Sequence, residues 1–239
     1  MPRLVDLSMP VHRDMLTFPR VPPPTMVVYE TWEEFAERIG AAEHGVTWLT
    51  ASYVVITSDH VGTHCDSVKH LRGPDAPGVE AIPLEYCFSD GVRLDFRHKE
   101  SGTWIEPGEI DEKLSEIGYT LKPRDIVLIH TGAGAYNTEE RYRTDHCGMT
   151  AEATRHLIDQ GVLMMGCDAI TFDPPVWSMF EHKRFWEAHR VMIDTDYWHL
   201  ENLMNLDQIP THGFKLSVFP VAWQGTTGAP VRAVAIIDD

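Results

Sequence analysis

Two short apolar runs, separated by a segment that carries the signals of a helix, constrain the fold of this chain more than any other feature. Residues 126–129 within the segment 125–131, and residues 162–167, are apolar without interruption, which favours strands buried on both faces. Between them, Thr150 is a good helix N-cap and Gly161 a typical residue after a helix end, so we expect a helix over residues 150–160. Strand, helix and strand in this order predict an α/β unit with a crossover connection.

The rest of the chain also predicts mixed α and β structure. Pro107, followed by apolar residues at helical spacing and then Gly118, predicts a helix over residues 107–117. Residues 28–46 are ambiguous, because they can form a helix around 33–39 or a mobile flap. Further strands are expected at residues 3–8, 46–58, 91–96, 215–219 and 231–237. With no internal repeat and 43% hydrophobic residues, we expect a single domain over residues 1–239.

Charge and composition exclude several classes of partner. The chain has 36 acidic and 20 basic side chains, giving a net charge of −16, which disfavours nucleic acid and anionic membranes. No secretory signal and no run of about 18 apolar residues is found, so no membrane association is expected. Four widely spaced cysteines without a Cys-x-x-Cys pair favour a reduced, cytoplasmic protein.

The densest group of metal-binding side chains lies in the run HVGTHCDSVKH at residues 60–70. In an extended backbone His60, His64 and Asp66 share one face, and Cys65 points to the other as a packed residue. In a helix, His60 would instead pair with His64, and Asp66 with His70. Either geometry can hold a cation, and nitrogen and oxygen ligands suit zinc, manganese or iron(II). The alternative is that these histidines lie close together in the sequence without binding a metal.

Further candidate metal ligands lie downstream of this run. His189 and Glu201 are 12 residues apart, but they can equally be a helix-end residue and a surface charge. Asp168 and Asp173 can orient imidazoles, although turn or capping roles are more ordinary for either. The downstream candidates are His182, His189, His199, Glu201 and His212.

An aromatic segment can form a pocket for a flat, apolar substrate. It comprises residues 174–180 together with Phe185 and Trp186. Aromatic side chains also dominate cores and subunit interfaces. Thr63 can likewise donate a hydrogen bond near a metal or simply pack within a strand.

The run from His60 to Asp66, with His70 four residues further on, resembles the signature of the metal-dependent cyclase-like hydrolases. This family includes bacterial kynurenine formamidase, isatin hydrolase and trans-dienelactone hydrolase. The resemblance covers nearly the whole chain. Its supporting marks are VDLS at 5–8, DIVL at 125–128, GCD at 166–168, ENL at 201–203 and GAPVRAV at 228–234.

This resemblance implies a fold, a ligand set and a general activity. The fold would be α/β, a single barrel-like domain of the swivelling β/β/α type, in a homodimer or homotetramer. The cofactor would be zinc or manganese, one or two ions per subunit, and the substrate a small aromatic or cyclic molecule. His70 would be catalytic, and the metal ligands would be His60, His64 and Asp66, with His189 and Glu201 completing a second position.

One departure affects the expected catalytic residue. The family commonly has a proline two residues after the motif aspartate, where this chain has Val68. Proline would fix the backbone that leads to His70. The placing of His70 and the choice of substrate therefore stay open.

The expected reaction is hydrolysis of a cyclic amide or lactone, or cleavage of an aryl formamide, by a metal-bound hydroxide. A divalent cation lowers the pKa of bound water from about 15.7 towards 7 and polarises a carbonyl, while a histidine such as His70 can accept a proton and return it. One alternative is a family cyclase of aromatic natural-product biosynthesis, and another is a non-catalytic metal-binding protein. A third is a non-haem iron oxygenase, whose all-antiparallel barrel fits poorly with helices at 107–117 and 150–160.

Overall fold

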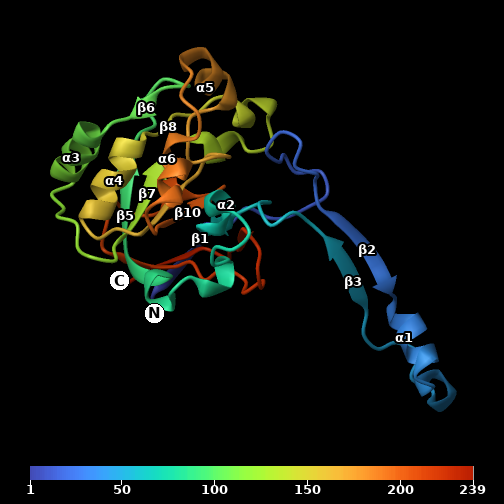
Figure 1. The fold of residues 1–239 in the computed structure, drawn as a ribbon. Helices are drawn as coiled ribbons and strands as arrows, with labels where there is room; N and C mark the ends of the chain where they lie inside the picture. The colour runs from blue at the N-terminus through green and yellow to red at the C-terminus, as the bar shows by residue number, and fades with distance from the viewer. Residues whose placement is uncertain (239) are drawn as a thin grey trace.

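A nine-stranded sheet forms the centre of the computed structural model, which describes residues 1–238 (Figure 1). The four middle strands, β5, β7, β9 and β10, run parallel to one another, and the flanking pairs are antiparallel. In spatial order the strands are β1 (Arg3–Asp6), β13 (Val234–Ile237), β11 (Phe214–Ser217), β5 (Phe88–Asp95), β7 (Ile126–His130), β9 (Met164–Cys167), β10 (Trp198–Glu201), β4 (His64–Asp66) and β12 (Gly228–Pro230).

Helices connect the parallel strands and cover one face of this sheet (Figure 1). Thr150 caps α4 by accepting a hydrogen bond from the Ala153 amide at 3.0 Å, and α3 begins with a proline and a capping box. The helices are α2 (Lys69–Arg72), α3 (Pro107–Glu116), α4 (Ala151–Asp159), α5 (Val176–His182) and α6 (Glu187–Arg190). A small parallel pair, β6 (Trp104–Ile105) and β8 (Gly148–Met149), lies beside them.

Short 3₁₀ turns make most of the remaining connections. They are η1 (Ala41–His44), η2 (Val79–Ala81), η3 (Leu84–Tyr86), η4 (Ala133–Tyr136), η5 (Glu140–Arg143), η6 (Val191–Ile193) and η7 (Leu206–Gln208). Of these, η1 lies near the tip of a projecting hairpin, and η6 directly follows α6.

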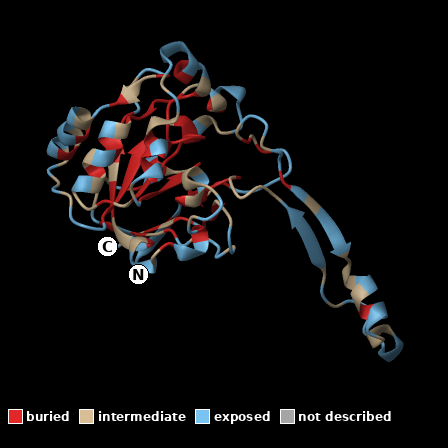
Figure 2. Cartoon of the chain, in the orientation of Figure 1, coloured by how far each residue is buried: buried red, intermediate tan, exposed pale blue. Residues whose placement is uncertain are grey.

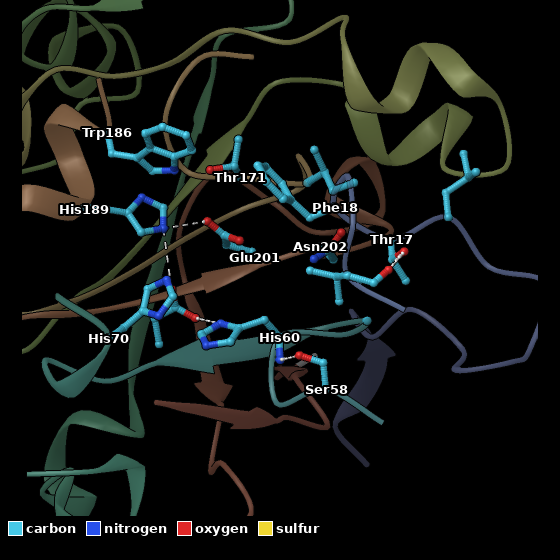
Figure 3. A pocket seen from close by; sticks show the side chains of 15 residues that line it. Thr17, Phe18, Ser58, His60, His70, Thr171, Trp186, His189, Glu201 and Asn202 are labelled. Atoms are coloured by element: carbon cyan, nitrogen blue, oxygen red, sulfur yellow. Dashed lines mark hydrogen bonds and ion pairs between the residues drawn. The ribbon is translucent and has the colours of Figure 1, made fainter. Parts of the chain in front are cut away.

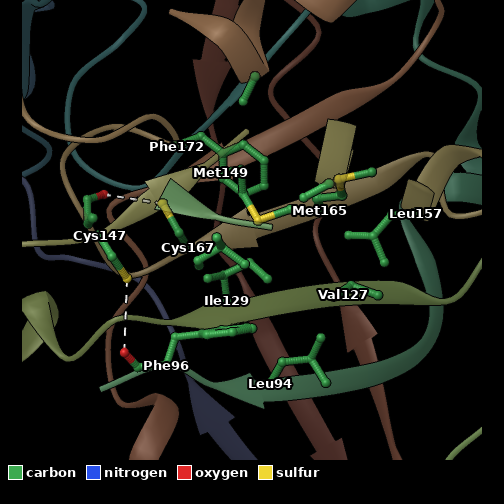
Figure 4. Close-up of a cluster of buried hydrophobic side chains, with 14 of the residues drawn as sticks. Leu94, Phe96, Val127, Ile129, Cys147, Met149, Leu157, Met165, Cys167 and Phe172 are labelled. Atoms are coloured by element: carbon green, nitrogen blue, oxygen red, sulfur yellow. Dashed lines mark hydrogen bonds between the residues drawn. The ribbon is translucent and has the colours of Figure 1, made fainter. Parts of the chain in front are cut away.

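Both faces of the sheet are buried. Along β7, Val127 and Ile129 pack with the helices in one core (Figure 4), whereas Ile126 and Leu128 belong to a second core on the opposite face. Strand side chains alternate between faces, so a strand covered on both sides must be apolar throughout. The interpretation of residues 125–131 and 162–167 as buried strands flanking a helix is confirmed, as is the α/β, barrel-like fold class.

Some predicted boundaries were wrong. Only Ser52–Ile56 (β3) of the expected strand 46–58 is extended, and it pairs with β2 (Thr25–Glu30) instead of joining the central sheet. Gly62 has a φ of +64°, so the chain turns before β4 and His60 does not lie on that strand. The helix α2 begins only at Lys69, so Asp66 and His70 do not share a helix either.

Residues 25–56 form a long projecting hairpin, here called the arm (Figure 1). It consists of β2, α1 (Trp32–Arg38), η1 and β3, so the ambiguous segment does contain the expected helix. Almost all of β2 and β3 is exposed on both faces (Figure 2). Two-stranded ribbons are marginal in water without a covering partner, so the arm needs an explanation beyond this chain's own packing.

Two further expectations concerned reduced cysteines and the absence of a membrane-spanning segment. Cys65, Cys87, Cys147 and Cys167 are all buried and unpaired. In residues 1–238, none of the helices combines the length and apolar character that crossing a bilayer would take.

Gly148 provides a test of this packing. A Cβ at this residue of β8 would lie 2.1 Å from the Asp173 carbonyl carbon and 2.2 Å from the Pro174 nitrogen, which are backbone atoms that cannot turn aside. We expect Gly148→Ala to lower the free energy of unfolding by about 1–3 kcal/mol through overpacking. Urea denaturation measures this.

The control is Gly108→Ala in α3, where an added Cβ meets nothing within 4 Å. It should leave stability unchanged or raise it by up to about 1 kcal/mol. Equal stabilities for the two variants would show that the contact at Gly148 is not as tight as described.

Candidate metal centre

Two neighbouring strands bring four polar side chains onto one face of the sheet. In the antiparallel pair β4–β10, Asp66 lies opposite His199 and His64 lies opposite Glu201. Cys65, between the two β4 residues, points to the other face and is buried in the second core, as predicted from strand alternation. All four polar residues are buried.

Three more imidazoles reach the same point from outside these strands. His60 comes from the turn before β4, His70 from α2 and His189 from α6 (Figure 3). Their nearest nitrogens lie 2.9 Å (His60), 3.9 Å (His70) and 3.5 Å (His189) from Asp66 carboxylate oxygens. Asp66 is therefore the centre of the cluster.

Glu201 faces the same imidazoles from the next strand. Its Oε1 lies 3.4 Å from His189 Nε2, and its Oε2 lies 3.6 Å from His64 Nε2. Oε1 also accepts the Phe172 amide at 2.7 Å, which fixes the carboxylate. The two buried carboxylates thus lie among nitrogens that can share a cation with them.

In two of the imidazoles, the Nδ1 nitrogen, which faces away from the two carboxylates, is hydrogen-bonded to an oxygen acceptor. His64 Nδ1 lies 2.8 Å from the Gly62 carbonyl oxygen, and His189 Nδ1 lies 2.5 Å from Asp173 Oδ2. A carbonyl or carboxylate can only accept, so each Nδ1 carries the hydrogen. In the neutral ring, Nε2 then presents a lone pair to Asp66 and Glu201, which is how histidine ligates metals.

His60 is oriented in the opposite sense by residues that the sequence interpretation missed. Thr227 Oγ1 lies 2.7 Å from Asp59 Oδ2 and 2.8 Å from His60 Nε2. The single hydroxyl hydrogen goes to the carboxylate, so His60 donates through Nε2 and turns Nδ1 towards Asp66 Oδ1 at 2.9 Å; in the neutral ring this Nδ1 is bare. Asp59 and Thr227 are far apart in sequence, and no spacing indicates this relay.

Three buried atoms at this point have no hydrogen-bond partner among the described residues. They are His64 Nε2, Asp66 Oδ2 and His199 Nε2. Leaving buried polar atoms unpaired is costly. A divalent cation would satisfy bare imidazole nitrogens and carboxylate oxygens together, so the donor set fits a metal of the zinc or manganese kind.

The electrostatics keep both carboxylates ionised. Burial opposes ionisation of Glu201, but the imidazoles of His199 and His189 outweigh it and lower its pKa to about 2. Burial likewise opposes ionisation of Asp66, but the surrounding imidazoles, His60 first among them, outweigh it and hold its pKa well below the ordinary value. For His70, burial together with the charges of neighbouring imidazoles lowers the pKa to about 4, so this ring is neutral near pH 7.

The structure sorts the sequence candidates. His60, His64, Asp66, His189 and Glu201 converge, and His70 lies at the rim with its ring centre 4.2 Å from that of His60. His199 is in the cluster although the resemblance did not include it among the ligands. Elsewhere, His182 packs edge-on against Trp104, and His212 lies against Tyr119.

The structure also distinguishes the residues that were expected to orient the ligands. Asp173 orients His189, whereas Asp168 accepts amide hydrogen bonds from Thr131 and Gly132 and so organises the turn after β7. Thr63 donates to the Asn202 carbonyl at 2.6 Å, which is a packing role.

A cavity of about 310 Å³ opens beside the cluster (Figure 3). Of the aromatic segment expected to wall it, Trp186 does so, but Trp177, Phe180 and Phe185 are exposed on the surface. The apolar wall comes instead from the segment before the arm, which the sequence interpretation missed. The lining residues besides the cluster are Leu16, Thr17, Phe18, Val21, Ser58, Gly62, Ile170, Thr171, Trp186 and Asn202.

Comparison with known proteins places the chain in a family. The Cyclase family model matches residues 5–174, and the chain belongs to this family. Among curated proteins it is 27% identical over 232 residues to the kynurenine formamidase of Bacillus cereus, covering 96% of this chain and 95% of that protein. It is also 26% identical over 182 residues to the kynurenine formamidase of Sphingopyxis alaskensis, covering 75% and 78%.

Solved structures share the fold over the whole chain. Isatin hydrolase A from Labrenzia aggregata, solved with benzyl benzoate, superimposes with a TM-score of 0.82 at 24% identity, covering 100% of this chain and 94% of that one. An isatin hydrolase bound to the product analogue thioisatinate gives 0.84 at 18% identity, covering 100% and 93%. These likenesses confirm the fold.

Asp173 gives a test of the centre. Asp173→Asn keeps the shape of the side chain but removes the charge that faces His189 Nδ1 at 2.5 Å. We expect metal affinity to fall about 10–100-fold, as for other partners of ligand histidines. Titration of the chelator-stripped protein with Zn²⁺ against a chromophoric chelator measures it.

Asp111→Asn is the matched control, because Asp111 pairs with His156 at 2.7 Å on the surface, away from the cluster. It should leave affinity unchanged. Equal affinities for wild type and Asp173→Asn would contradict a role of Asp173 in the centre.

Proposed function

We propose that this chain is a metal-dependent hydrolase that opens a cyclic amide or lactone, or cleaves an aryl formamide. The observation that carries this proposal is the convergence of imidazole nitrogens on Asp66 and Glu201 beside an apolar cavity. The ligands would be His60, His64, Asp66, His189 and Glu201, with His70 as the proton carrier.

The cavity supports a flat, partly apolar substrate. Phe18 and Trp186 provide aromatic surface, and Thr171 and Asn202 provide hydrogen-bonding groups close to Glu201. Pockets of this composition hold a ring by its faces and orient it through a few polar contacts. The formamidases and isatin hydrolases that resemble this chain carry names of aromatic amide substrates, and we extend that class to this protein.

His70 is suited to move a proton. A divalent cation in this centre would lower the pKa of water and polarise a carbonyl. His70 is about one-third exposed, lines the cavity and lies 3.9 Å from Asp66 Oδ2, too far for a hydrogen bond. As a neutral ring it can accept a proton from water and return it to the departing nitrogen or oxygen.

The donor set supports zinc or manganese, as one or two ions. The cluster offers only nitrogen and oxygen atoms, because Cys65 points to the opposite face. An oxygenase is disfavoured, since the middle of the sheet is parallel whereas that class uses an all-antiparallel barrel. A ring-closing cyclase would use the same centre, and the substrate screen below distinguishes it.

His70→Ala tests the mechanism. We expect hydrolysis to fall about 10²–10⁴-fold, the usual contribution of a general acid or base, while metal content stays unchanged because His70 is not among the proposed ligands. Purified protein would be screened on N-formylkynurenine, isatin and small lactones, with metal content determined by elemental analysis.

His156→Ala is the control, since His156 lies on α4 and pairs only with Asp111; its rate should match wild type. An unchanged rate for His70→Ala would remove His70 from the mechanism. Wild-type protein with no stoichiometric metal would overturn the proposed function itself.

We further propose that the arm joins copies of this chain in a homodimer or homotetramer. Both faces of its two-stranded ribbon expose apolar side chains, among them Val28, Tyr29, Tyr53 and Val55, at 48% to 72% of their full area. Such patches on an extended hairpin are typical of interaction surfaces. A second copy of the chain would cover the same residues on both subunits.

Arm deletion tests this assembly. Thr25 pairs with Ile56, so a short Gly-Ser linker can replace the residues between them without straining the body. We expect light scattering after gel filtration to report an oligomer for wild type and a monomer for the deletion. A wild-type monomer would contradict the proposal.

A matched pair of point variants separates the arm from general surface effects. Tyr53→Glu lies on the arm and Leu84→Glu on the body, and the two side chains are similarly exposed, at 56% and 67%. Only Tyr53→Glu should weaken the oligomer.

A further inference from the structure

His199 was one of five downstream candidate ligands, the resemblance did not include it, and the fold places it inside the cluster. It is fully buried, and its ring stacks on Phe172 with centroids 4.8 Å apart and planes within 13°. Its Nε2 lies 3.4 Å from Asp66 Oδ2 and 3.5 Å from Glu201 Oε1. The ring therefore has one fixed orientation, directed at both carboxylates.

The hydrogen bonds around His199 determine which of its nitrogens is bare. Tyr197 donates its hydroxyl hydrogen to the Ala188 carbonyl at 2.6 Å. His199 Nδ1 lies 3.3 Å from the same hydroxyl oxygen, which has no second hydrogen to give, so Nδ1 must be the donor. In the neutral ring Nε2 then presents a lone pair to two carboxylate oxygens. That contact is repulsive unless a positive charge lies between them.

The spacing of the four atoms matches a zinc-like coordination shell. Two nitrogens (His189, His199) and two oxygens (Asp66, Glu201) are separated by 3.4 to 3.5 Å in all four nitrogen–oxygen pairs. A tetrahedron with metal–donor distances of about 2.0–2.1 Å has edges of about 3.3–3.4 Å. The four residues therefore surround a point at which one cation can contact all of them.

We propose that His199 is a metal ligand that completes a second cation position together with Asp66, His189 and Glu201. This inference rests on the proposed function, since it assumes that the centre binds metal. The sequence resemblance gave this second position one imidazole, that of His189, and the inference adds the imidazole of His199.

The opposite oxygens of the two carboxylates define a first position of the same composition. Asp66 Oδ1 lies 2.9 Å from His60 Nδ1 and 3.2 Å from His64 Nε2, and Glu201 Oε2 lies 3.6 Å from His64 Nε2. Each position thus has two nitrogens and two oxygens, with both carboxylates shared. We expect two ions per subunit, held with comparable affinity.

Metal titration of His199→Leu tests the inference. Leucine keeps apolar contact with Phe172 but removes the nitrogen. We expect wild type to take up two Zn²⁺ in competition with a chromophoric chelator, and His199→Leu to keep one and bind the second at least about 100-fold more weakly, more than is usual for loss of a residue that only orients a ligand. The visible spectrum of bound Co²⁺ should change with the loss of an imidazole.

His146→Leu is the matched control, because His146 is an equally buried histidine that is not part of the cluster; both ions should bind as in wild type. His199→Gln, which keeps a polar side chain, provides a second variant if the leucine variant does not fold.

The outcomes separate the possible roles of His199. If it were a protonated counter-ion for Asp66 and Glu201, its removal would leave the site more negative, and the second ion would bind as tightly or more tightly. That result, or unchanged titration, would overturn the inference while leaving the proposed function intact. Wild-type protein that takes up no metal would instead overturn the proposed function.

Discussion

The antiparallel pairing of β4 with β10 is the constraint on which the rest of the site depends. It sets Asp66 opposite His199 and His64 opposite Glu201, so two carboxylates meet on one buried face. A shift of β4 by one residue in this register would turn Asp66 and His64 towards the apolar core that now holds Cys65. Because buried charges without partners are very costly, the hydrophobic side of the sheet fixes the register that the polar side uses.

The way each ring is held supports the different roles proposed for the histidines. His64 and His189 are each anchored at the outer nitrogen, by a carbonyl and a carboxylate respectively, so their inner nitrogens are directed at the centre before any ion arrives. Such preorganisation favours a ligand, which must keep its lone pair and its direction. His70 lies at the rim, about one-third exposed and beyond hydrogen-bond distance of Asp66, and a residue that takes up and releases protons needs that freedom.

The sequence predicts the chemistry of this centre better than its geometry. Periodicity and caps indicated the helices α3 and α4 and the buried strands, because these signals are local. The cluster at 60–70 indicated metal-type donors, but the turn at Gly62 depends on a positive φ that the spacing did not reveal. His199 was only one of five downstream candidates, and nothing in the sequence distinguished it, because the tautomer of its ring is fixed by Tyr197 and Ala188, which only the fold brings together.

The position of the arm would connect the proposed assembly to the proposed metal centre. Val21 lines the cavity shortly before β2 begins at Thr25, and Ser58 lines it two residues after β3 ends at Ile56. Both ends of the hairpin therefore lie in the wall of the cavity. The exposed ribbon cannot hold itself in place by its own packing, so a contact that immobilises it would also fix the apolar wall and the turn that carries His60. In the proposed oligomer, the same segment would therefore set both the assembly and the shape of the cavity.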